Sequence, residues 1–312
     1  MGKRKFQVAV ILINYNSSQY TLDCINSIRT RTTLDLRYQI IVIDNASRVE
    51  EFREIEFLRS IPDVQLFRSK INTGFSGANM MGVELADADY YYFLNNDTIL
   101  LNDCLSILHS FLEGHERVAN SSGEMFTASG EYEYNFRYFP TLSLKLFGSG
   151  IMRKIWPEKF PDKYTRLTQP TRVDAVSGSS MFIRASAFED IGGFDTHYFL
   201  YLEEEDIALR LYRSGYLTYL VPEAKYQHFG SKSTQADKKI NLTFLKEFHI
   251  SLLYYYGKNY NSAYRFLFQV LYFFKTIRKF YKHRDYVTLA FFIASGAPGK
   301  HSLRFKQQIQ LE

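Results

Sequence analysis

Strands and helices alternate over the first hundred residues, and this alternation restricts the fold more than any other feature of the chain. Short apolar runs bounded by turn residues predict strands, and the stretches between them have helical spacing. Consecutive strands joined by helices pair in parallel within one sheet. The sequence therefore predicts an α/β fold with a mostly parallel, doubly wound sheet. Its expected strands are residues 8–13, 39–43, 64–68 and 90–94, and its expected helices are residues 17–31, 50–60 and 77–86.

Polar side chains follow three of these strands at the point where each strand ends. The carboxyl ends of parallel strands meet at one edge of the sheet, and ligands of doubly wound sheets bind there. Residues 72–79 are rich in small residues and open a helix, whose N-terminus favours phosphate. We therefore expect a binding site at this edge. Its candidate residues are Asn14, Tyr15, Asn16, Asp44, Asn72, Gly74, Asn79, Asn95 and Asn96.

Several common motifs are missing from the sequence. No G-x-G-x-x-G follows the first strand, which disfavours a nicotinamide or flavin site of the Rossmann type. A P-loop and a G-x-S-x-G nucleophile elbow are also missing. If a nucleotide binds, it is held by something other than a glycine-rich phosphate cradle.

Asp97 is the single carboxylate in the Asn95-Asn96-Asp97 stretch that ends the fourth strand. Oxygen ligands of this kind suit Mg²⁺ or Mn²⁺, and a metal held by few protein groups commonly bridges a diphosphate. A turn stabilised by the Asp side chain is an equally good interpretation. His228 could supply a second metal or diphosphate ligand, although a lone histidine is more often structural. Asp44 could accept the N3–H of a pyrimidine or bind a ribose hydroxyl, or it could cap a turn.

Four acids in a row, at residues 203–206, follow an aromatic, apolar run and begin a helical pattern. Helical phase puts Glu204 in the middle of the apolar side, where a carboxylate is costly unless it is used. Desolvation would also raise its pKa toward that of a useful base. The same phase puts Glu203 and Asp206 on the opposite side, with Asp206 able to pair with Arg210. An acidic first turn that complements the helix dipole is the competing interpretation.

The last 75 residues are basic and aromatic, with thirteen Lys and Arg against three acids in residues 238–312. A basic helix with an aromatic face suits an anionic membrane surface. A C-terminal helix that packs its apolar face on the domain explains the pattern equally well. The expected apolar stripe is Phe266, Leu267, Val270, Leu271, Phe274, Ile277 and Tyr281, and the basic residues mostly off it are Lys275, Arg278, Lys279 and Lys282.

The motifs described above occur in an order that resembles the family 2 inverting glycosyltransferases of the GT-A fold, in particular the bacterial rhamnosyltransferase-like branch. The likeness extends from about residue 6 to about residue 235. It rests on the stretches at 10–16, 42–47, 72–79, 94–98, 192–195 and 199–206 together with His228.

The resemblance implies a nucleotide-sugar donor, a divalent Mn²⁺ or Mg²⁺ ion, and single displacement with inversion at the anomeric carbon. By the same likeness, Asp44 contacts the base of the donor, Asp97 and His228 bind the metal or diphosphate, and Glu204 is the catalytic base. Many relatives have Asp where this chain has Asn95, and Asp is commoner than Glu at position 204. Glu203 and Glu205 are the alternative bases.

These observations predict a GT-A catalytic domain over residues 1–235, divided near residue 100 into a nucleotide-binding half and an acceptor half, and a helical segment over 236–312. Residues 121–171 form a looser stretch expected to face the acceptor. Two isolated cysteines, Cys24 and Cys104, argue against a disulfide scaffold, and no apolar span reaches about 20 residues.

We expect a cytoplasmic enzyme, peripheral on the inner face of the cell membrane, that transfers a sugar from dTDP-rhamnose or a UDP-hexose. The expected acceptor is a hydroxyl of a glycan or lipid-linked precursor of a cell-surface polysaccharide, and no nucleic-acid partner is expected. A sugar-nucleotide nucleotidyltransferase is the alternative enzyme, but such enzymes usually carry a Gly- and Lys/Arg-rich loop after the first strand. A degenerate sugar-nucleotide-binding assembly partner is the non-enzymatic alternative.

Overall fold

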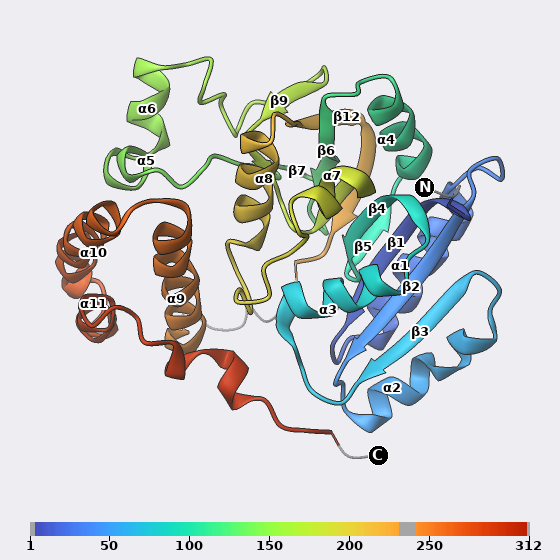
Figure 1. Ribbon diagram of the computed structural model, residues 1–312, viewed down its shortest axis with the longest axis horizontal. Coiled ribbons are helices and arrows are strands. Elements are labelled where there is room, and N and C mark those ends of the chain that lie inside the picture. Colours follow the sequence, from blue (N-terminus) through green and yellow to red (C-terminus); the bar gives the residue numbers. More distant parts are fainter. Residues whose placement is uncertain (1–3, 231–240, 311–312) are drawn as a thin grey trace.

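A curled sheet of ten strands forms the centre of the computed structural model, which describes residues 4–230 and 241–310 (Figure 1). The strands are β1 Phe6–Asn14, β2 Tyr38–Asn45, β3 Val64–Ser69, β4 Ala88–Asn95, β5 Thr98–Leu100, β6 Val118–Phe126, β7 Tyr132–Glu133, β8 Phe136–Arg137, β9 Thr171–Val173, β10 Ala175–Val176, β11 Ser180–Arg184 and β12 Leu217–His228. Of these, β8 and β10 form a separate two-stranded sheet.

Helices cover the sheet and form a block at its far end (Figure 1). They are α1 Ser18–Arg31, α2 Val49–Ile55, α3 Gly74–Glu84, α4 Cys104–Glu113, α5 Leu142–Phe147, α6 Ser149–Ile155, α7 Ala185–Asp190, α8 Glu203–Arg213, α9 Leu242–Asn259, α10 Ser262–Ile277 and α11 Asp285–Ala294. Short 3-10 turns follow at Glu56–Ser60, Arg278–Tyr281, Gly299–His301 and Leu303–Lys306.

The predicted α/β sheet is confirmed in the first half of the chain. The strand order is β3-β2-β1-β4-β11-β6-β12-β5, and β1 pairs in parallel with β2 and β4 while β2 pairs in parallel with β3. The second half is mixed, because β11 is antiparallel to both β4 and β6, whereas β6 and β12 are parallel. The carboxyl ends of β1, β2 and β4 therefore lie at one edge, as expected.

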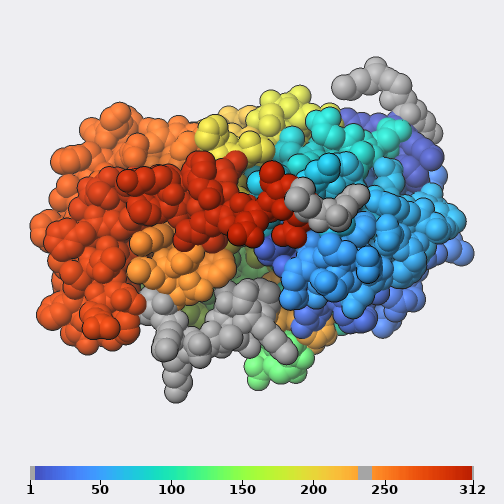
Figure 2. All heavy atoms as spheres, turned by 90° about the horizontal axis from the view of Figure 1, so that it is seen from below, coloured from blue at the N-terminus to red at the C-terminus, as the bar shows by residue number. Residues whose placement is uncertain are grey.

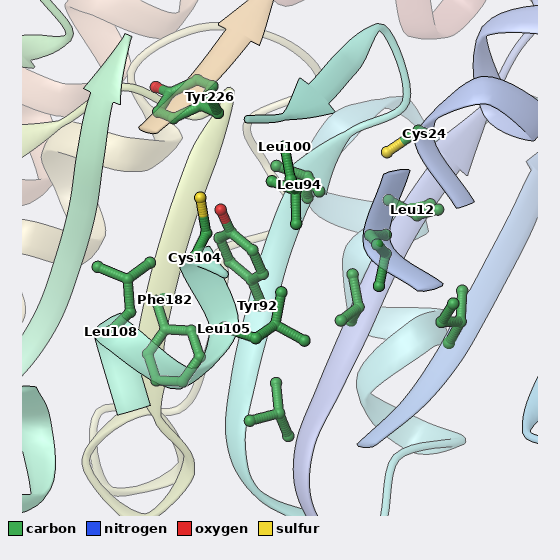
Figure 3. Close-up of a cluster of buried hydrophobic side chains, with 14 of the residues drawn as sticks. Leu12, Cys24, Tyr92, Leu94, Leu100, Cys104, Leu105, Leu108, Phe182 and Tyr226 are labelled. Carbon is green, nitrogen blue, oxygen red and sulfur yellow. The ribbon is translucent and has the colours of Figure 1, made fainter. Parts of the chain in front are cut away.

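The core on one side of the sheet is built from apolar side chains of β1, β4, β11 and helices α1 and α4 (Figure 3). Tyr92 and Phe182 pack with their ring centroids 5.5 Å apart at its centre. Both cysteines, Cys24 and Cys104, are free, fully buried members of this cluster, so they act as small apolar side chains there.

Strand β6 was not predicted, because its polar composition resembles a loop. Its side chains are nevertheless almost all buried, since β6 lies between β11 and β12. Asn135 satisfies part of this polar interior by donating to the Ser122 hydroxyl and the Gly123 carbonyl. The looser stretch expected from residue 121 therefore begins after residue 126.

Strand β12 is longer than the strand that the sequence predicts, which is a short one over residues 216–221 ended by Pro222-Glu223-Ala224. That prediction of the strand end is wrong, because pairing with β6 resumes after a register shift between Leu220 and Lys225. Proline is tolerated in a strand at such an irregularity, where its missing N–H interrupts no ladder bond. As a result, β12 continues to His228 and brings that side chain back to the end of β4.

The C-terminal helices pack on the catalytic half through one apolar cluster. Tyr198, Leu202 and Leu209 contribute to it from around α8, and Tyr255 and Tyr256 contribute from α9. The helices thus continue the core that surrounds the acid run. The predicted domain boundary at residue 235 lies outside the described residues.

The expected apolar stripe of α10 is not its buried face. Phe268 is 1% exposed and packs on Tyr256 and Tyr272, whereas Phe266 and Phe274 of the stripe are 68% and 57% exposed. Packing of this stripe on the domain, one of the two alternatives left open by the sequence, is therefore not observed for Phe266 and Phe274. The helix is apolar on both sides, and Tyr264, Phe268 and Tyr272 face the protein.

The end of the chain runs from the helical block to the part formed by the first hundred residues, as the red segment in Figure 2 shows. The backbone N–H of Gln310 donates to the carbonyl of Lys70, at 2.8 Å. Among the described residues, no helix combines the length and apolarity needed to cross a membrane.

Candidate functional site

The ends of β1 and β2 share a buried polar cluster. Asn14 donates to Asp44 at 2.8 Å and to Ser47 at 3.2 Å, and the backbone N–H of Ser47 donates to Asp44 at 3.2 Å. Arg68 in β3 forms an ion pair with Asp44, with 3.6 Å between Nε and Oδ2. The neighbouring register of the two strands, Asn14 beside Asp44, explains why the two side chains meet. The predicted residues Asn14 and Asp44 therefore act together, with Asn14 orienting the carboxylate.

A second cluster lies at the start of α3. Asn45 accepts from the Thr73 backbone at 2.9 Å and donates to Asn72, whose side chain accepts from the Gly74 backbone at 2.8 Å. Gly74 has φ +76°, and a Cβ on it would overlap the carbonyl oxygen of Phe199. Only glycine fits this left-handed, crowded position. The contact joins the nucleotide-binding half to the stretch that precedes the acid run.

Four predicted binding residues lie away from the centre of the site. Tyr15 is 47% exposed, and Asn16 holds the loop after β2 by accepting from the Arg48 backbone. Asn96 donates to Ser17 and Thr21 at the start of α1, which anchors the turn after β4. Asn79 is 1% exposed inside α3. These positions support the backbone around the site.

Asp97, in the turn between β4 and β5, lies beside His228 at the end of β12. The Nε2 atom of His228 lies 3.1 Å from Oδ1 of Asp97 and 3.3 Å from Nδ2 of Asn95. Both side chains are mostly buried, at 9% exposed for Asp97 and 19% for His228. No group of three or more His, Cys, Asp or Glu residues with metal-binding geometry occurs in the described parts of the chain. The pair thus offers one carboxylate and one imidazole, which fits a cation completed by water and phosphate oxygens.

The acid run begins α8 after two strained residues. Tyr201 and Leu202 have φ values of +75° and +69°, in the left-handed region that side chains other than Gly, Asn and Asp rarely adopt. Ser251 of α9 holds this turn by donating to the Leu200 carbonyl at 2.8 Å. Such strain costs about 1–3 kcal/mol per residue and persists where the surrounding structure determines the conformation. Here it aims the first turn of α8 into the site.

Glu203 and Asp206 are the buried acids of this run, which corrects the helical phase expected from the sequence. Asp206 is fully buried because α9 covers that side of α8, and it accepts from Arg210 at 2.8 Å, Lys258 at 2.9 Å and Asn259 at 3.0 Å. The predicted pairing of Asp206 with Arg210 is therefore present. Burial, followed by the charge of Glu204, raises the pKa of Glu203 well above its usual value.

Glu204 and Glu205 face outward toward Arg137 of β8. The Nε atom of Arg137 lies 3.4 Å from Oε1 of Glu204 and 3.8 Å from Oε1 of Glu205. Glu204 is 12% exposed, so it is reachable from solvent although it is well packed. Burial, followed by the charge of Glu204, raises the pKa of Glu205 to about 7. Glu204 and Glu205, at 12% and 13% exposed, are therefore the acids of this run that a ligand could contact.

The loop between β10 and β11 connects Glu204 to the end of β4. The carbonyl of Ser179 accepts from the Asn95 backbone at 3.0 Å, and Glu204 approaches Gly178 closely enough that a Cβ there would lie 3.9 Å from its carboxyl group. A cavity of about 690 Å³ includes both Arg137 and His228 in its lining. This cavity is thus lined by His228, which pairs with Asp97, and by Arg137, which pairs with Glu204 and Glu205.

Three groups at this site were missed by sequence reasoning. Arg68 and Arg137 are isolated basic residues in irregular or short elements, and their sequence context resembles that of any surface arginine. The Ser177-Gly178-Ser179-Ser180 stretch was noted only as an interruption of a strand. Its small residues after an apolar run were the available signal for a loop that approaches a ligand.

The family model described as glycosyl transferase family 2 matches residues 9–192 of this chain. Rhamnosyltransferase WbbL of Escherichia coli is 36% identical over 146 residues, which cover 46% of this chain and 53% of that protein. The N-acetylglucosaminyl-diphospho-decaprenol L-rhamnosyltransferase of Mycobacterium tuberculosis is 42% identical over 67 residues, or 22% of each chain. The matches thus span about half the length of the first relative and less of the second.

Two solved structures resemble the fold. The mannosyltransferase PcManGT of Pyrobaculum calidifontis, in complex with GDP-Man and Mn²⁺, has a TM-score of 0.55 at 15% identity and covers 81% of this chain and 64% of its own. GalNAc-T7 with UDP, GalNAc and Mn²⁺ has a TM-score of 0.55 at 16% identity, with 72% and 44% covered. At these identities the similarity establishes the fold.

Proposed function

This chain belongs to glycosyl transferase family 2 and has the GT-A fold, and we propose that it transfers a sugar from a nucleotide-diphosphate donor to a hydroxyl of a glycan or lipid-linked acceptor, with inversion. The observation that carries the proposal is one cavity lined both by His228, which pairs with Asp97, and by Arg137, which pairs with Glu204. An in-line displacement needs the leaving group and the attacking oxygen on opposite sides of the anomeric carbon. A leaving-group site and a base beside different parts of the lining of one cavity are compatible with that requirement.

The nucleotide of the donor occupies the edge formed by β1, β2 and α3. Asp44 accepts the N3–H of a pyrimidine or a ribose hydroxyl, with Asn14 holding its carboxylate in place. The Nε atom of Arg68 lies 3.6 Å from Asp44, too far for a strong hydrogen bond, so the carboxylate retains capacity for a further donor. Gly74 allows the backbone of the Asn72–Gly74 stretch to lie against the ligand without a side chain.

Asp97 and His228 hold a divalent cation, Mn²⁺ or Mg²⁺, together with the diphosphate of the donor. The donor set fits this role, because an oxygen and an imidazole are common Mn²⁺ ligands and leave positions for phosphate oxygens. When bound, the ion supplies Lewis-acid stabilisation of the leaving diphosphate. The Nδ2 atom of Asn95 lies 3.3 Å from Nε2 of His228, the same ring nitrogen that faces Asp97, so Asn95 borders this site.

Glu204 is the general base. Its side chain is 12% exposed beside Arg137, whereas Glu203 is buried. The pKa of Glu205 is raised to about 7, so this group is partly protonated at neutral pH. Glu204 takes the proton of the acceptor hydroxyl as the C–O bond forms and the bond from the anomeric carbon to the diphosphate breaks. Positioned bases contribute about 10²–10⁴-fold to such reactions.

The product belongs to the synthesis of a cell-surface polysaccharide, and dTDP-rhamnose is the first donor to test, with UDP-hexoses second. The named rhamnosyltransferase relatives support this choice. We place the chain at the inner face of the cell membrane, bound through residues 238–312 and through α5 and α6. Large apolar side chains there are 48–68% exposed beside Lys and Arg residues, a combination that favours an anionic bilayer. They are Phe147, Ile151, Ile155, Trp156, Phe266, Leu267, Phe274, Phe280 and Phe291.

A thermal-shift panel tests the proposal. Purified protein is heated with dTDP-rhamnose, UDP-glucose, UDP-N-acetylglucosamine and GDP-mannose, each with Mn²⁺, Mg²⁺ or EDTA. We expect a dTDP- or UDP-sugar to raise the melting temperature only when a metal is present, because binding to the native state stabilises it. Absence of any nucleotide-dependent shift with either metal would contradict the proposal.

A further inference from the structure

Three cations surround the outward acids of α8. Arg137 touches Glu204 and Glu205 directly. Lys163 lies nearby, with its ammonium 4.5 Å from the ring centroid of Tyr138 and 5.9 Å from that of Phe136, the two neighbours of Arg137 in the chain. Lys145 of α5 lies 5.7 Å above the ring of Phe248. All three come from residues 121–171, the stretch expected to face the acceptor.

Two of the three cations in this cluster have no carboxylate partner among the described residues. Within residues 4–230 and 241–310, neither Lys145 nor Lys163 forms an ion pair with a carboxylate. Burial, with repulsion from Arg137, lowers the pKa of Lys163 to about 8, and burial also lowers the pKa of Lys145. The pKa of Glu205 is raised to about 7, so at neutral pH this carboxyl group neutralises only part of the positive charge of the three cations. Burial makes the charged form of a lysine less favourable, and a bound anion would stabilise that charged form.

The position of the cluster identifies the side of the reaction that it serves. Inversion requires the base and the leaving group on opposite sides of the transferred sugar. Arg137, which lies beside Glu204, and His228, which lies beside Asp97, are separate parts of the lining of one cavity. An anion at Arg137 therefore belongs to the acceptor rather than to the leaving diphosphate.

Continuing outward from the cations, the surface becomes apolar. Phe147 follows Lys145 by two residues and is 58% exposed, and Ile151 of α6 is 50% exposed. The backbone carbonyl of Lys145 accepts from Lys275, which ties α5 to the exposed side of α10. The order from the base outward is thus carboxylate, cations and apolar surface.

We propose that Arg137, Lys145 and Lys163 form a binding site for the phosphate or diphosphate of a lipid-linked acceptor, with the acceptor sugar at Glu204 and the hydrocarbon on α5, α6 and α10. The inference deepens the proposed function, on which it rests, by assigning the residues that recognise the acceptor. Charged hydrogen bonds between these cations and phosphate oxygens provide the affinity. Arg137 exchanges part of its contact with Glu204 for the anion, which leaves the base free to accept a proton.

Farnesyl diphosphate in EDTA is the probe, because without metal the Asp97–His228 end contributes little to diphosphate binding. Its dissociation constant is measured by calorimetry with the full chain and with Arg137→Gln, Lys145→Gln, Lys163→Gln, Arg137→Lys and, as matched control, Lys159→Gln. Lys159 is an exposed lysine four residues from Lys163 and lines a different cavity. Melting curves establish that each variant is folded.

Each Gln substitution in the cluster should weaken the binding of farnesyl diphosphate about tenfold, whereas Lys159→Gln should weaken it less than twofold. Arg137→Lys should weaken binding less than Arg137→Gln does. Farnesol should bind all variants alike, which separates the diphosphate from the hydrocarbon. Equal farnesyl diphosphate affinity across the variants would overturn the assignment. Binding that requires Mn²⁺ and disappears in Asp97→Asn would also overturn it, because the anion would then lie on the leaving-group side.

Failure of the proposed function would give a different result. The wild-type protein would then show no thermal shift with a nucleotide sugar and metal, whether or not it binds farnesyl diphosphate.

Discussion

The imidazole of His228 lies 3.1 Å from the carboxylate of Asp97, although β12 and the turn after β4 are far apart in the chain. The contact depends on β12 continuing past Pro222 beside β6, and on its antiparallel pairing with β5, in which His228 is opposite Thr98. This meeting of two distant segments converts a strand-end turn into a site that fits a cation and a diphosphate.

Replacing Asp97 with Asn should abolish metal-dependent stabilisation by the donor, because the site has one carboxylate to offer in this pair. His228→Ala should weaken metal affinity about tenfold or more, which is the usual loss when a group around a bound metal is removed. Thermal shift with the preferred nucleotide sugar and Mn²⁺ measures both effects. Asp89→Asn, at an exposed acid near the other end of β4, is the control. An unchanged nucleotide-sugar shift in Asp97→Asn would remove this residue from the metal site.

Gly74→Ala should destabilise the protein and weaken donor binding. The new Cβ would overlap the carbonyl oxygen of Phe199, and φ at this position is +76°. Gly130→Ala is the matched control, because its φ is +82° and nothing lies within 4 Å of the added Cβ. The control should lose about 1–2 kcal/mol of unfolding free energy from the left-handed conformation alone, and Gly74→Ala should lose clearly more in urea titrations. Equal losses would show that the contact with Phe199 adjusts at no cost.

Glu205→Gln should gain stability relative to the wild type as the pH rises from 5 to 8. The pKa of Glu205 is raised from 4.5 to about 7 in the folded protein, first by burial and then by the charge of Glu204. Between those values the folded state binds more protons than the unfolded state, so a rising pH destabilises the wild type through this group. The gain should be on the order of 2 kcal/mol at pH 8 and small at pH 5. Glu223→Gln, at an exposed acid of β12, should show no such trend in denaturant titrations.

Trp156 is the single tryptophan of the chain and is 54% exposed at the end of α6, so its fluorescence reports on the proposed membrane surface. Vesicles of phosphatidylcholine with phosphatidylglycerol should shift its emission to the blue, and salt should weaken the effect. The double substitution Phe266→Glu and Phe274→Glu should reduce binding in co-sedimentation. Leu34→Glu, at a fully exposed apolar residue between α1 and β2, is the control. Identical binding by the double variant and this control would argue against the surface.

The parallel half of the sheet could be predicted because its strands are apolar throughout and its helices keep a regular period. The polar residues at the strand ends followed from the same topology, and the pairing of Asn14 with Asp44 is a direct result of register. Strand β6 could not be predicted, since its Asn, Ser and Glu side chains are polar yet buried, and only some of them, such as Ser122 with Asn135, have a tertiary partner among the described residues. The continuation of β12 past Pro222 was hidden for a related reason: its β-bulge depends on β6.

The acid run shows the limit of periodicity most clearly. A helix wheel assumes one buried side, but α8 packs against the sheet region on one side and against α9 on the other. Asp206 is therefore buried with Lys258 and Asn259, partners that no local pattern reveals. Arg137 was likewise invisible, because β8 is two residues long and meets the acids only through the fold. The choice of Glu204 came from that helical phase and from the order of the motifs, and it stays a prediction.

The central claim is that Glu204 is the base of a metal-dependent sugar transfer. Its most direct test measures transfer and donor binding in the same preparation of Glu204→Gln, beside Glu203→Gln and Glu205→Gln. The account predicts that Glu204→Gln lowers transfer by at least about 10²-fold while the donor-induced thermal shift with Mn²⁺ is retained. Near wild-type transfer by Glu204→Gln, with loss in Glu203→Gln or Glu205→Gln instead, would contradict it.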